Sequence, residues 1–275
     1  MKILEQLEQQ LASLGPLAVA VSGGVDSMTL AVVAHRVNPQ VEIFHAVSAA
    51  VPRQATARVK QYAKREQWRL NIINAGEIND PDYLANPANR CYFCKTNLYD
   101  TVVSQTDHLV LSGANLDDLG DYRPGLDAAK EHQVKHPYVD AGIDKATLRA
   151  IAKHLSLTDL YDLPAAPCLA SRIETGIAIN PELLPVINET EQALWDRLQL
   201  SLPIKGIRCR LRKSGVAIEL QTSEDIDTSA DYALEATKIV SDRFTSHGFA
   251  KYTAHITIEP YRRGSAFLVE TLTVE

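Results

Sequence analysis

The stretch VAVSGGVDSMTL, residues 19–30, carries the clearest structural signal of this chain. In it an apolar run meets two glycines, two serines and an aspartate, and an apolar pattern with helical spacing then begins. A strand, a glycine turn and a helix in this order bring backbone N–H groups together at the positive end of the helix dipole. The turn is therefore predicted to bind phosphate.

The residues of this turn suit an anion. Gly23 and Gly24 can adopt positive φ and let the backbone approach a ligand, because they carry no Cβ. Ser22 and Ser27 add hydroxyl groups, and Asp26 is expected either to hold Mg²⁺ or to order the loop. The pattern G-x-x-x-x-G-K-[ST] is absent, so this would be a different phosphate cradle. The alternative is a tight turn with a Ser or Asp helix cap, which alone calls for neither both glycines nor both serines.

Strands and helices alternate around the turn. After an opening helix that ends at Gly15-Pro16, strands are predicted at 17–21, 41–47, 69–74 and 108–112, and helices at 27–37, 53–67, 91–105 and 144–154. This alternation favours an α/β fold, a parallel sheet covered by helices, which binds ligands at the carboxyl ends of its strands. The glycine turn would lie at that edge.

The pattern changes after residue 154. Residues 157–176 are rich in Pro and Gly and lack a clear period, which indicates a loop and a domain junction. Beyond it we expect a helix at 181–198, paired strands at 206–212 and 216–220, a helix at 230–246 and a strand at 252–259. The sequence thus predicts a phosphate-binding domain over 1–165. A smaller α+β domain over 166–275, with the Cys168 loop, would serve substrate binding or oligomerisation.

The bulk composition narrows the class of protein. A chain of 275 residues that is 45% hydrophobic can form one large domain or two modest ones. The net charge of -6 argues against a nucleic-acid partner, because such proteins usually carry a clustered basic excess, and leaves a small anionic ligand open. The N-terminus does not resemble a signal peptide, and no apolar run approaches the ~20 residues of a membrane span. We expect a cytoplasmic protein without a membrane partner.

Four cysteines in a reducing compartment favour metal ligands, reactive thiols or core packing over disulfides. Cys91 and Cys94 lie one helical turn apart, and Cys168 lies in a loop that could fold back over the same strand ends. Three thiolates without an obvious fourth ligand are typical of an iron–sulfur cluster with one open iron, whereas structural zinc usually has four protein ligands. A zinc site completed by a histidine, or uncoordinated thiols, are the alternatives.

The fourth cysteine belongs to a strand with the sequence IRCRLR, residues 207–212. A period of two puts Arg208, Arg210 and Arg212 on one face and Cys209 on the other, so that Cys209 is expected in the core. Three guanidinium groups in a row suit a phosphate, and a solvated strand face fits the same pattern.

The loop SGGVDS resembles the pyrophosphate-binding loop of the ATP pyrophosphatase (PP-loop) superfamily, which splits ATP into AMP and pyrophosphate. With NRCYFCK, SGANLDDLGDYRPGLDAA, PCLASRI and IRCRL in this order, the chain resembles the LarE family, the pyridinium-3,5-bisthiocarboxylic acid mononucleotide synthases. The resemblance runs from the first strand to about Glu259 and implies a PP-loop (HUP-like) fold. Enzymes of this family make the sulfur-bearing ligand of the nickel-pincer cofactor of lactate racemase.

The resemblance implies a two-step reaction. ATP with Mg²⁺ adenylates a carboxylate of a dicarboxylated pyridinium mononucleotide, since a carboxylate has no leaving group, and a sulfur nucleophile then displaces AMP. In one branch the sulfur comes from a single protein cysteine, which becomes dehydroalanine. In the other branch three cysteines hold a 4Fe-4S cluster whose open iron carries a sulfide. The resemblance also implies a homo-oligomer.

The resemblance assigns roles residue by residue. Cys168 matches the sacrificial cysteine, while Cys91 and Cys94 mark the cluster branch, which we favour, with all three as iron ligands. Asn115, Asp117 and Asp118 are expected beside nucleotide or Mg²⁺. Ser171 and Arg172 follow the cysteine, and Arg208 and Arg210 are expected to bind the substrate phosphate.

Three other functions remain open at this point. A cluster-dependent tRNA-thiolating enzyme of the same superfamily would need a polynucleotide-binding face. A regulatory protein could sense nucleotide at the turn without chemistry, although it would not need the acidic pair and the three thiols. An NAD or GMP synthetase shares the loop but uses ammonia, which leaves Cys168 and the CxxC pair unexplained.

Overall fold

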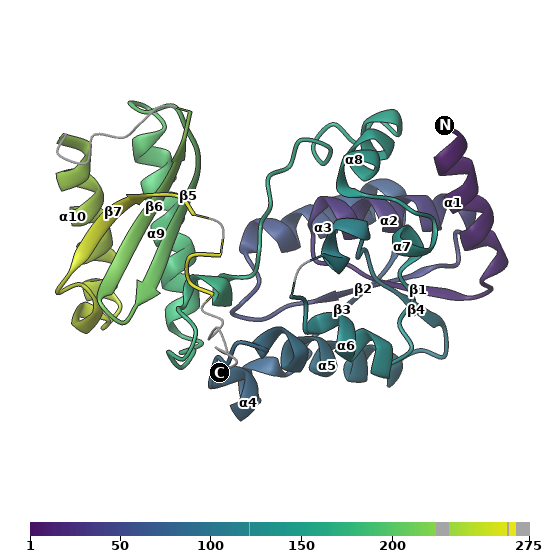
Figure 1. Cartoon of the computed structure of the whole chain (residues 1–275), viewed down its shortest axis with the longest axis horizontal. Coiled ribbons are helices and arrows are strands. Elements are labelled where there is room, and N and C mark those ends of the chain that lie inside the picture. The colour runs from purple at the N-terminus through teal and green to yellow at the C-terminus, as the bar shows by residue number, and fades with distance from the viewer. Residues whose placement is uncertain (121, 224–230, 263, 268–275) are drawn as a thin grey trace, which may run out of the picture. The chain divides into compact units, whose positions relative to one another are not determined.

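The computed structural model describes residues 1–120, 122–223, 231–262 and 264–267 (Figure 1). Two residues of the sequence predictions, Asp121 and Ala230, lie outside this part. The chain forms two compact units, one with residues Met1–Asp80 and Asn89–Ala166, the other with Pro81–Ala88 and Pro167–Glu275. The short segment Pro81–Ala88 is thus separated in sequence from the rest of its unit.

The first unit is built on a four-stranded parallel sheet with the strand order β3-β2-β1-β4. Its strands are β1 (Leu17–Ala20), β2 (Glu42–Ala46), β3 (Arg69–Ile73) and β4 (Leu109–Leu111). The α/β fold with a parallel sheet is therefore confirmed. Because β1 is buried throughout and lies between β2 and β4, the loop that follows it opens at the middle of the sheet's carboxyl edge.

Helices cover both faces of this sheet (Figure 1). One face is covered by α1 (Lys2–Ser13), α2 (Val25–Val37), α3 (Arg53–Glu66), α7 (Pro137–Asp140) and α8 (Lys145–His154). The other face carries α5 (Arg90–Val103) and α6 (Gly125–Glu131). Each face has its own apolar core, and the leucines of α1 at helical spacing, Leu4, Leu7 and Leu11, are buried in the first. Helices α6 and α7 were not predicted, since they are too short to show a period.

The second unit contains a separate three-stranded sheet with the order β5-β6-β7. Strand β5 (Ile204–Arg212) pairs antiparallel with β6 (Gly215–Thr222), and β7 (Ile256–Pro260) pairs parallel to β6. The helices are α4 (Pro81–Leu84), α9 (Leu183–Leu198) and α10 (Asp231–Ser246). The smaller sheet near the C-terminus is as predicted, but β7 starts at Ile256 and not at residue 252, because Ala250–Tyr252 form a 3-10 turn.

Asn86 ties the segment Pro81–Ala88 to the second unit. Its buried side-chain amide donates hydrogen bonds to the backbone carbonyls of Glu174 and Ile177, each at 2.9 Å. The backbone carbonyl of Asn86 accepts from the backbone N–H of Gly176 at 2.9 Å. A buried amide that satisfies several backbone groups at once fixes the fold of a loop. No helix in the described part of the chain is long and apolar enough to cross a membrane.

Candidate active site

The glycine turn connects β1 to α2, and its two glycines differ. Gly23 has a φ of 82°, and a Cβ there would lie 2.8 Å from the carbonyl oxygen of Ala55 on α3. Both the backbone angle and the close approach of α3 therefore require glycine. Gly24 has a φ of -82°, and the nearest atom to an added Cβ would be Ser22 Oγ at 3.5 Å. Both glycines can adopt positive φ, and the structure uses this freedom only at Gly23.

The two serines of the turn close it. The hydroxyl of Ser27 accepts a hydrogen bond from the backbone N–H of Ser22 at 3.0 Å and lies 3.2 Å from the Ser22 hydroxyl. Ser27 is buried, whereas Ser22 is exposed at the opening of the turn. Helix α2 begins after Gly24, which has no side chain to cap it. The N–H groups of its first turn thus remain suited to an anion.

The loop after β4 packs against the start of α2. A Cβ on Gly113 would lie 2.7 Å from the backbone nitrogen of Ser27, so this contact also requires glycine. Two residues further on, the side chain of Asn115 donates to Asp26 Oδ1 at 3.2 Å and accepts from the backbone N–H of Asp117 at 3.1 Å. The structure therefore brings Asn115 to the carboxylate of Asp26, although 89 residues separate the two, and Asn115 in turn holds the backbone of Asp117.

The acidic pair belongs to a 3-10 helix over Leu116–Leu119. The carboxylate of Asp118 accepts from the backbone N–H of Asn115 at 3.0 Å and forms an ion pair with Arg123 at 2.9 Å. Asp118 thus shapes the loop, while Asp117 turns toward α8, where its carboxylate accepts from the backbone N–H of Lys145 at 3.3 Å.

Two cationic side chains that the sequence did not reveal contact the turn. Lys145 Nζ lies 2.6 Å from each carboxylate oxygen of Asp26, and Arg58 Nη1 donates to the carbonyl of Gly23 at 2.7 Å. Lys145 is the first residue of α8, which Asp144 caps through the backbone N–H of Thr147 at 2.7 Å. A lysine directly after a helix cap was the one available sequence signal, and it does not specify a partner 119 residues away.

Neutral buried groups support the turn from below. His45 on β2 bonds through Nδ1 to the carbonyl of Val21 and through Nε2 to the hydroxyl of Thr56, both at 2.9 Å. Burial lowers the pKa of His45 more than the bond to Val21 raises it. The hydroxyl of Tyr138 donates to the carbonyl of Asp26 at 3.1 Å, and burial raises the pKa of this phenol. These groups hold the backbone on either side of the glycines.

Cys91 and Cys94 lie at the start of α5 in the first unit, Cys91 exposed and Cys94 half-buried. Helix α6 approaches this turn closely, because a Cβ on Gly125 would lie 3.4 Å from the carbonyl oxygen of Cys91 and 2.9 Å from Lys95 Cγ. No disulfide joins any of the four cysteines, all of which are described.

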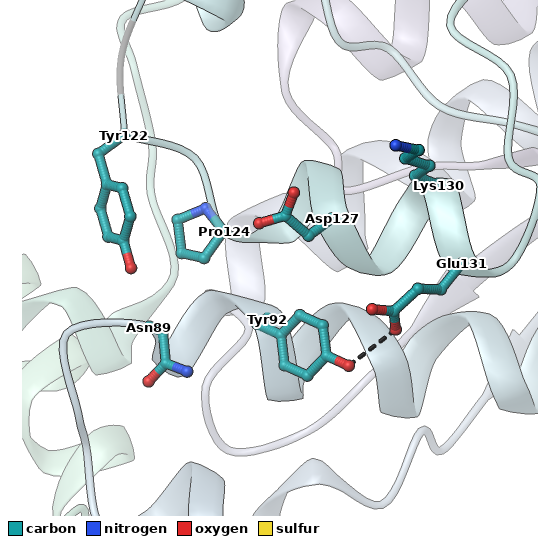
Figure 2. A pocket seen from close by; sticks show the side chains of 7 residues that line it. All are labelled: Asn89, Tyr92, Tyr122, Pro124, Asp127, Lys130 and Glu131. Atoms are coloured by element: carbon teal, nitrogen blue, oxygen red, sulfur yellow. Dashed lines mark hydrogen bonds between the residues drawn. The ribbon is translucent and has the colours of Figure 1, made fainter.

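A cavity of about 670 Å³ opens beside the same turn of α5, between it, α6 and the loop before α6 (Figure 2). Figure 2 shows the hydroxyl of Tyr92 directed at the carboxylate of Glu131, to which it donates at 2.7 Å. The cavity combines tyrosine rings, carboxylates and one ammonium group. Its lining residues are Asn89, Tyr92, Tyr122, Pro124, Asp127, Lys130 and Glu131.

Cys168 belongs to the second unit, where it precedes a 3-10 helix over Leu169–Arg172. The carbonyl of Cys168 accepts from Ser171 Oγ at 2.7 Å and from Arg172 Nη1 at 3.1 Å. Arg172 is buried and pairs with Glu191 through two bonds of 3.0 and 2.9 Å. Burial works to lower the pKa of Arg172, but the Glu191 carboxylate outweighs it and the pKa is raised. Ser171 and Arg172 thus hold the backbone of Cys168 in place.

The arginines of β5 are not on a solvated face. Arg210 is buried and donates through Nε to Glu219 at 2.8 Å, and Arg212 pairs with Glu219 and Glu259, each at 2.9 Å. Glu219 is fully buried on the neighbouring strand β6. The sequence placed the arginines on one face but did not assign them these carboxylates.

Arg208 and Cys209 complete the strand. Arg208 is half-buried and donates to the carbonyl of Ile207 at 2.7 Å; burial and the neighbouring Arg172 lower its pKa. Cys209 is fully buried, as predicted, and burial raises the pKa of its thiol. A thiol that resists ionisation is a poor metal ligand, because the ligand is the thiolate.

The predicted residues thus form two groups, one in each unit. The turn, Asn115, Asp117 and Asp118 are together in the first unit, and Cys168, Ser171, Arg172, Arg208 and Arg210 in the second. Within each unit, the described residues contain no group of three or more His, Cys, Asp or Glu side chains placed to hold a metal ion. The thiols proposed as iron ligands belong to both units, and the cluster stays a prediction.

The sequence of the chain is similar to those of several known proteins, at different levels of identity. No family model matches the chain. It is 25% identical to pyridinium-3,5-bisthiocarboxylic acid mononucleotide synthase of Lactiplantibacillus plantarum over 76% of both chains. It is 28% identical to the uncharacterized protein MJ0830 of Methanocaldococcus jannaschii over 90% of both chains.

The similarity to a cyanobacterial protein is higher and more complete. The chain is 33% identical over 268 residues to the uncharacterized protein slr1717 of Synechocystis sp., and the match covers 95% of each chain. The chain belongs to the same family as Synechocystis slr1717, with the synthase as a more distant relative.

Proposed function

We propose that the chain is an ATP-dependent sulfurtransferase that activates a carboxylate of a small phosphorylated substrate and replaces the resulting AMP by sulfur. The observation that carries the proposal is the turn at residues 22–27, which presents the start of α2 at the carboxyl edge of a parallel sheet. The distant relationship to the synthase supports the reaction class and a pyridinium dicarboxylate mononucleotide as substrate.

In this proposal the turn binds the pyrophosphate that leaves ATP. The N–H groups at the start of α2 and the exposed hydroxyl of Ser22 would donate to phosphate oxygens. The carboxylates of Asp26 and Asp117, which both bind Lys145, are oxygen ligands of the kind that Mg²⁺ prefers, and Asn115 orients Asp26 through its side-chain N–H. A bound Mg²⁺ would neutralise phosphate charge, and these residues would hold it.

The second unit offers a site for the substrate phosphate. The charge of Arg210 is already balanced by the buried Glu219, whereas the pKa of Arg208 is lowered by burial and by Arg172. A nearby anion would stabilise the charged form of Arg208 and relieve this repulsion. We therefore assign phosphate binding to Arg208 first, with Arg210, which Glu219 holds on the same face of β5, beside it.

The sulfur would come through the three thiols that are not in the core. Cys91, Cys94 and Cys168 are exposed or half-buried, and soft thiolates suit iron, so the donor set fits a cluster, whereas the buried Cys209 does not. A 4Fe-4S cluster held by them would supply an iron that carries the sulfide. Arg172 and Ser171 would keep Cys168 in position for either this role or direct sulfur donation.

Release of pyrophosphate from ATP, dependent on a pyridinium dicarboxylate mononucleotide, tests the proposal. The variant Gly24→Ala is expected to fold, because the Cβ fits at φ -82°, yet it places a methyl group beside Ser22 at the opening of the turn. We expect its affinity for ATP to fall about tenfold or more, which corresponds to one lost charge-assisted hydrogen bond.

Gly120→Ala is the matched control, since its nearest neighbour would be the carbonyl oxygen of Asp117 at 3.8 Å. This variant should bind ATP as the wild type does. Unchanged ATP binding by Gly24→Ala would reject the assignment of the turn. Absence of substrate-dependent pyrophosphate release from the wild type would reject the reaction.

A further inference from the structure

The pyrophosphate turn contains no lysine or arginine of its own, because residues 22–27 read SGGVDS. A pyrophosphate leaving group carries several negative charges, and cationic side chains are the usual means of stabilising them. The contact between Lys145 and the turn therefore calls for an explanation beyond packing. The ammonium group of Lys145 lies 2.6 Å from both carboxylate oxygens of Asp26, in the first turn of α2.

The ion pair between Lys145 and Asp26 contributes little to the stability of the folded protein. Its two side chains remain 34% and 29% exposed, and partly exposed ion pairs contribute about 0–1 kcal/mol. The backbone of Lys145 is nevertheless held firmly, by the Asp144 cap of α8 and by the bond to Asp117. A fixed backbone with a flexible four-carbon side chain lets the ammonium group move over a short range without any change in the fold.

Asp26 cannot pair with Lys145 through both carboxylate oxygens and bind a metal ion through the same oxygens at the same time. Lys145 contacts both of its oxygens and Asn115 contacts one of them, which leaves the carboxylate already neutralised. A Mg²⁺ ion approaching these oxygens would repel the ammonium group. Because Asp26 belongs to the first turn of α2, a phosphate bound at the start of that helix would offer the displaced ammonium group a new counter-charge.

We propose that Lys145 is the phosphate-binding cation of this turn, kept next to the empty turn by Asp26 and transferred to the pyrophosphate oxygens when ligand binds. The inference rests on the proposed function and adds a residue from α8 to it. Asp26 then has two partners in succession, Lys145 in the empty turn and the metal ion in the loaded one. Without Lys145, the negative charge of Asp26 would face the incoming polyanion without this counter-charge, because Asn115 contributes only a neutral amide.

Binding of inorganic pyrophosphate to the full chain, measured by titration calorimetry with EDTA and again with Mg²⁺, tests this. Lys145→Ala should weaken binding roughly 10- to 100-fold in both conditions, the range for one charge-assisted hydrogen bond, while Lys145→Arg retains most of it. Thermal unfolding should barely change in either variant. Lys153→Ala removes the same charge from the exposed end of α8 and should bind as the wild type does.

A second comparison separates phosphate contact from simple neutralisation of Asp26. In EDTA, Asp26→Asn should bind pyrophosphate at least as well as the wild type, because the repelling carboxylate is gone and Lys145 remains. If Lys145 contacts phosphate, the double variant Lys145→Ala/Asp26→Asn binds 10- to 100-fold more weakly than Asp26→Asn. Equal binding by these two variants would show that Lys145 only neutralises Asp26, and would overturn the inference.

The outcomes also distinguish this inference from the proposed function. A wild-type chain that does not bind pyrophosphate in either condition would overturn both. A wild type that binds pyrophosphate, together with a Lys145→Ala variant that binds it equally well, would overturn only the role of Lys145 and leave the turn as a pyrophosphate site.

Discussion

At the residue scale, the turn depends on side chains that come from other segments of the chain. Position 23 accepts only glycine because α3 lies against it, and position 113 accepts only glycine because the loop after β4 packs against α2. His45 connects three of these segments, since it lies on β2 and bonds to the end of β1 and to α3. Single substitutions at such positions act on the geometry of the turn without touching a ligand.

His45 should make stability depend on pH. Burial lowers its pKa in the folded protein, so below the ordinary histidine pKa of about 6.5 the unfolded chain binds a proton that the folded chain does not. The free energy of unfolding should therefore fall as the pH drops from about 7 toward 5, and His45 contributes at most ~1.4 kcal/mol per pH unit to this slope. Urea unfolding across this range measures it.

The variant His45→Gln should be less stable overall but show a shallower dependence on pH. Burial also lowers the pKa of His136, which contributes a slope of the same sign and remains in the variant. His154→Gln, at an exposed position of α8, is the control and should keep the wild-type slope. Equal slopes for wild type and His45→Gln would contradict the prediction.

At the element scale, the strand pair β5 and β6 carries a charged network inside a small domain. Glu219 on β6 lies opposite Arg208 in the strand register and binds Arg210 and Arg212. Arg212 in turn reaches Glu259 on β7. The three strands are therefore connected by side-chain ion pairs as well as by backbone bonds. The buried carboxylate of Glu219 stabilises the charges of Arg210 and Arg212 on the face of β5.

Replacing Glu219 should be far more costly than replacing Glu259. Glu219→Gln leaves the buried Arg210 without its counter-charge, and breaking a buried pair in this way costs about 3–5 kcal/mol. Glu259→Gln removes a partner that is 33% exposed and should cost about 0–1 kcal/mol. Urea unfolding of both variants measures the difference, and similar losses would show that Glu219 is not the residue that holds the strands.

At the scale of the whole molecule, the predicted chemistry is divided between two units. The turn for pyrophosphate and the pair Cys91 and Cys94 belong to the first unit, while Cys168 and the arginines of β5 belong to the second. A reaction that uses residues of both units depends on side chains that are far apart in the sequence. The relationship to slr1717 extends over both units, since it covers 95% of the chain.

The source of sulfur can be tested on the intact chain. With anaerobically reconstituted iron and a sulfide supply, the cluster proposal predicts several turnovers per chain and an unchanged polypeptide mass. Cys91→Ala and Cys168→Ala should each lose iron, acid-labile sulfide and thiocarboxylate formation, because each removes one thiolate ligand. Cys209→Ala is the matched control: it should keep its iron, since this thiol is fully buried in the core.

Mass spectrometry after turnover decides between the two sulfur sources. Dehydroalanine at position 168, together with a Cys91→Ala variant that still transfers sulfur, would reject the cluster and make Cys168 the donor. In that case one turnover per chain would be the maximum.

The sequence alone determined the order and type of the main elements and the position of the turn. Runs with periods of two and 3.6 residues predicted all four strands of the parallel sheet within two residues at each end, because these patterns are local. The family resemblance placed Asn115 beside the nucleotide site, and in the structure Asn115 contacts Asp26 of the turn. The short helices α4, α6 and α7 were missed, because they are too short to show a period.

Only the tertiary structure decided which charges meet. Lys145 lies 119 residues from Asp26, and Glu219 receives arginines from a neighbouring strand. The attachment of Pro81–Ala88 to the second unit through Asn86 is likewise a contact between distant segments. The physical reason is that ion pairs and side-chain hydrogen bonds depend on which surfaces pack together. Spacing along the chain specifies the face on which a side chain lies but not its partner.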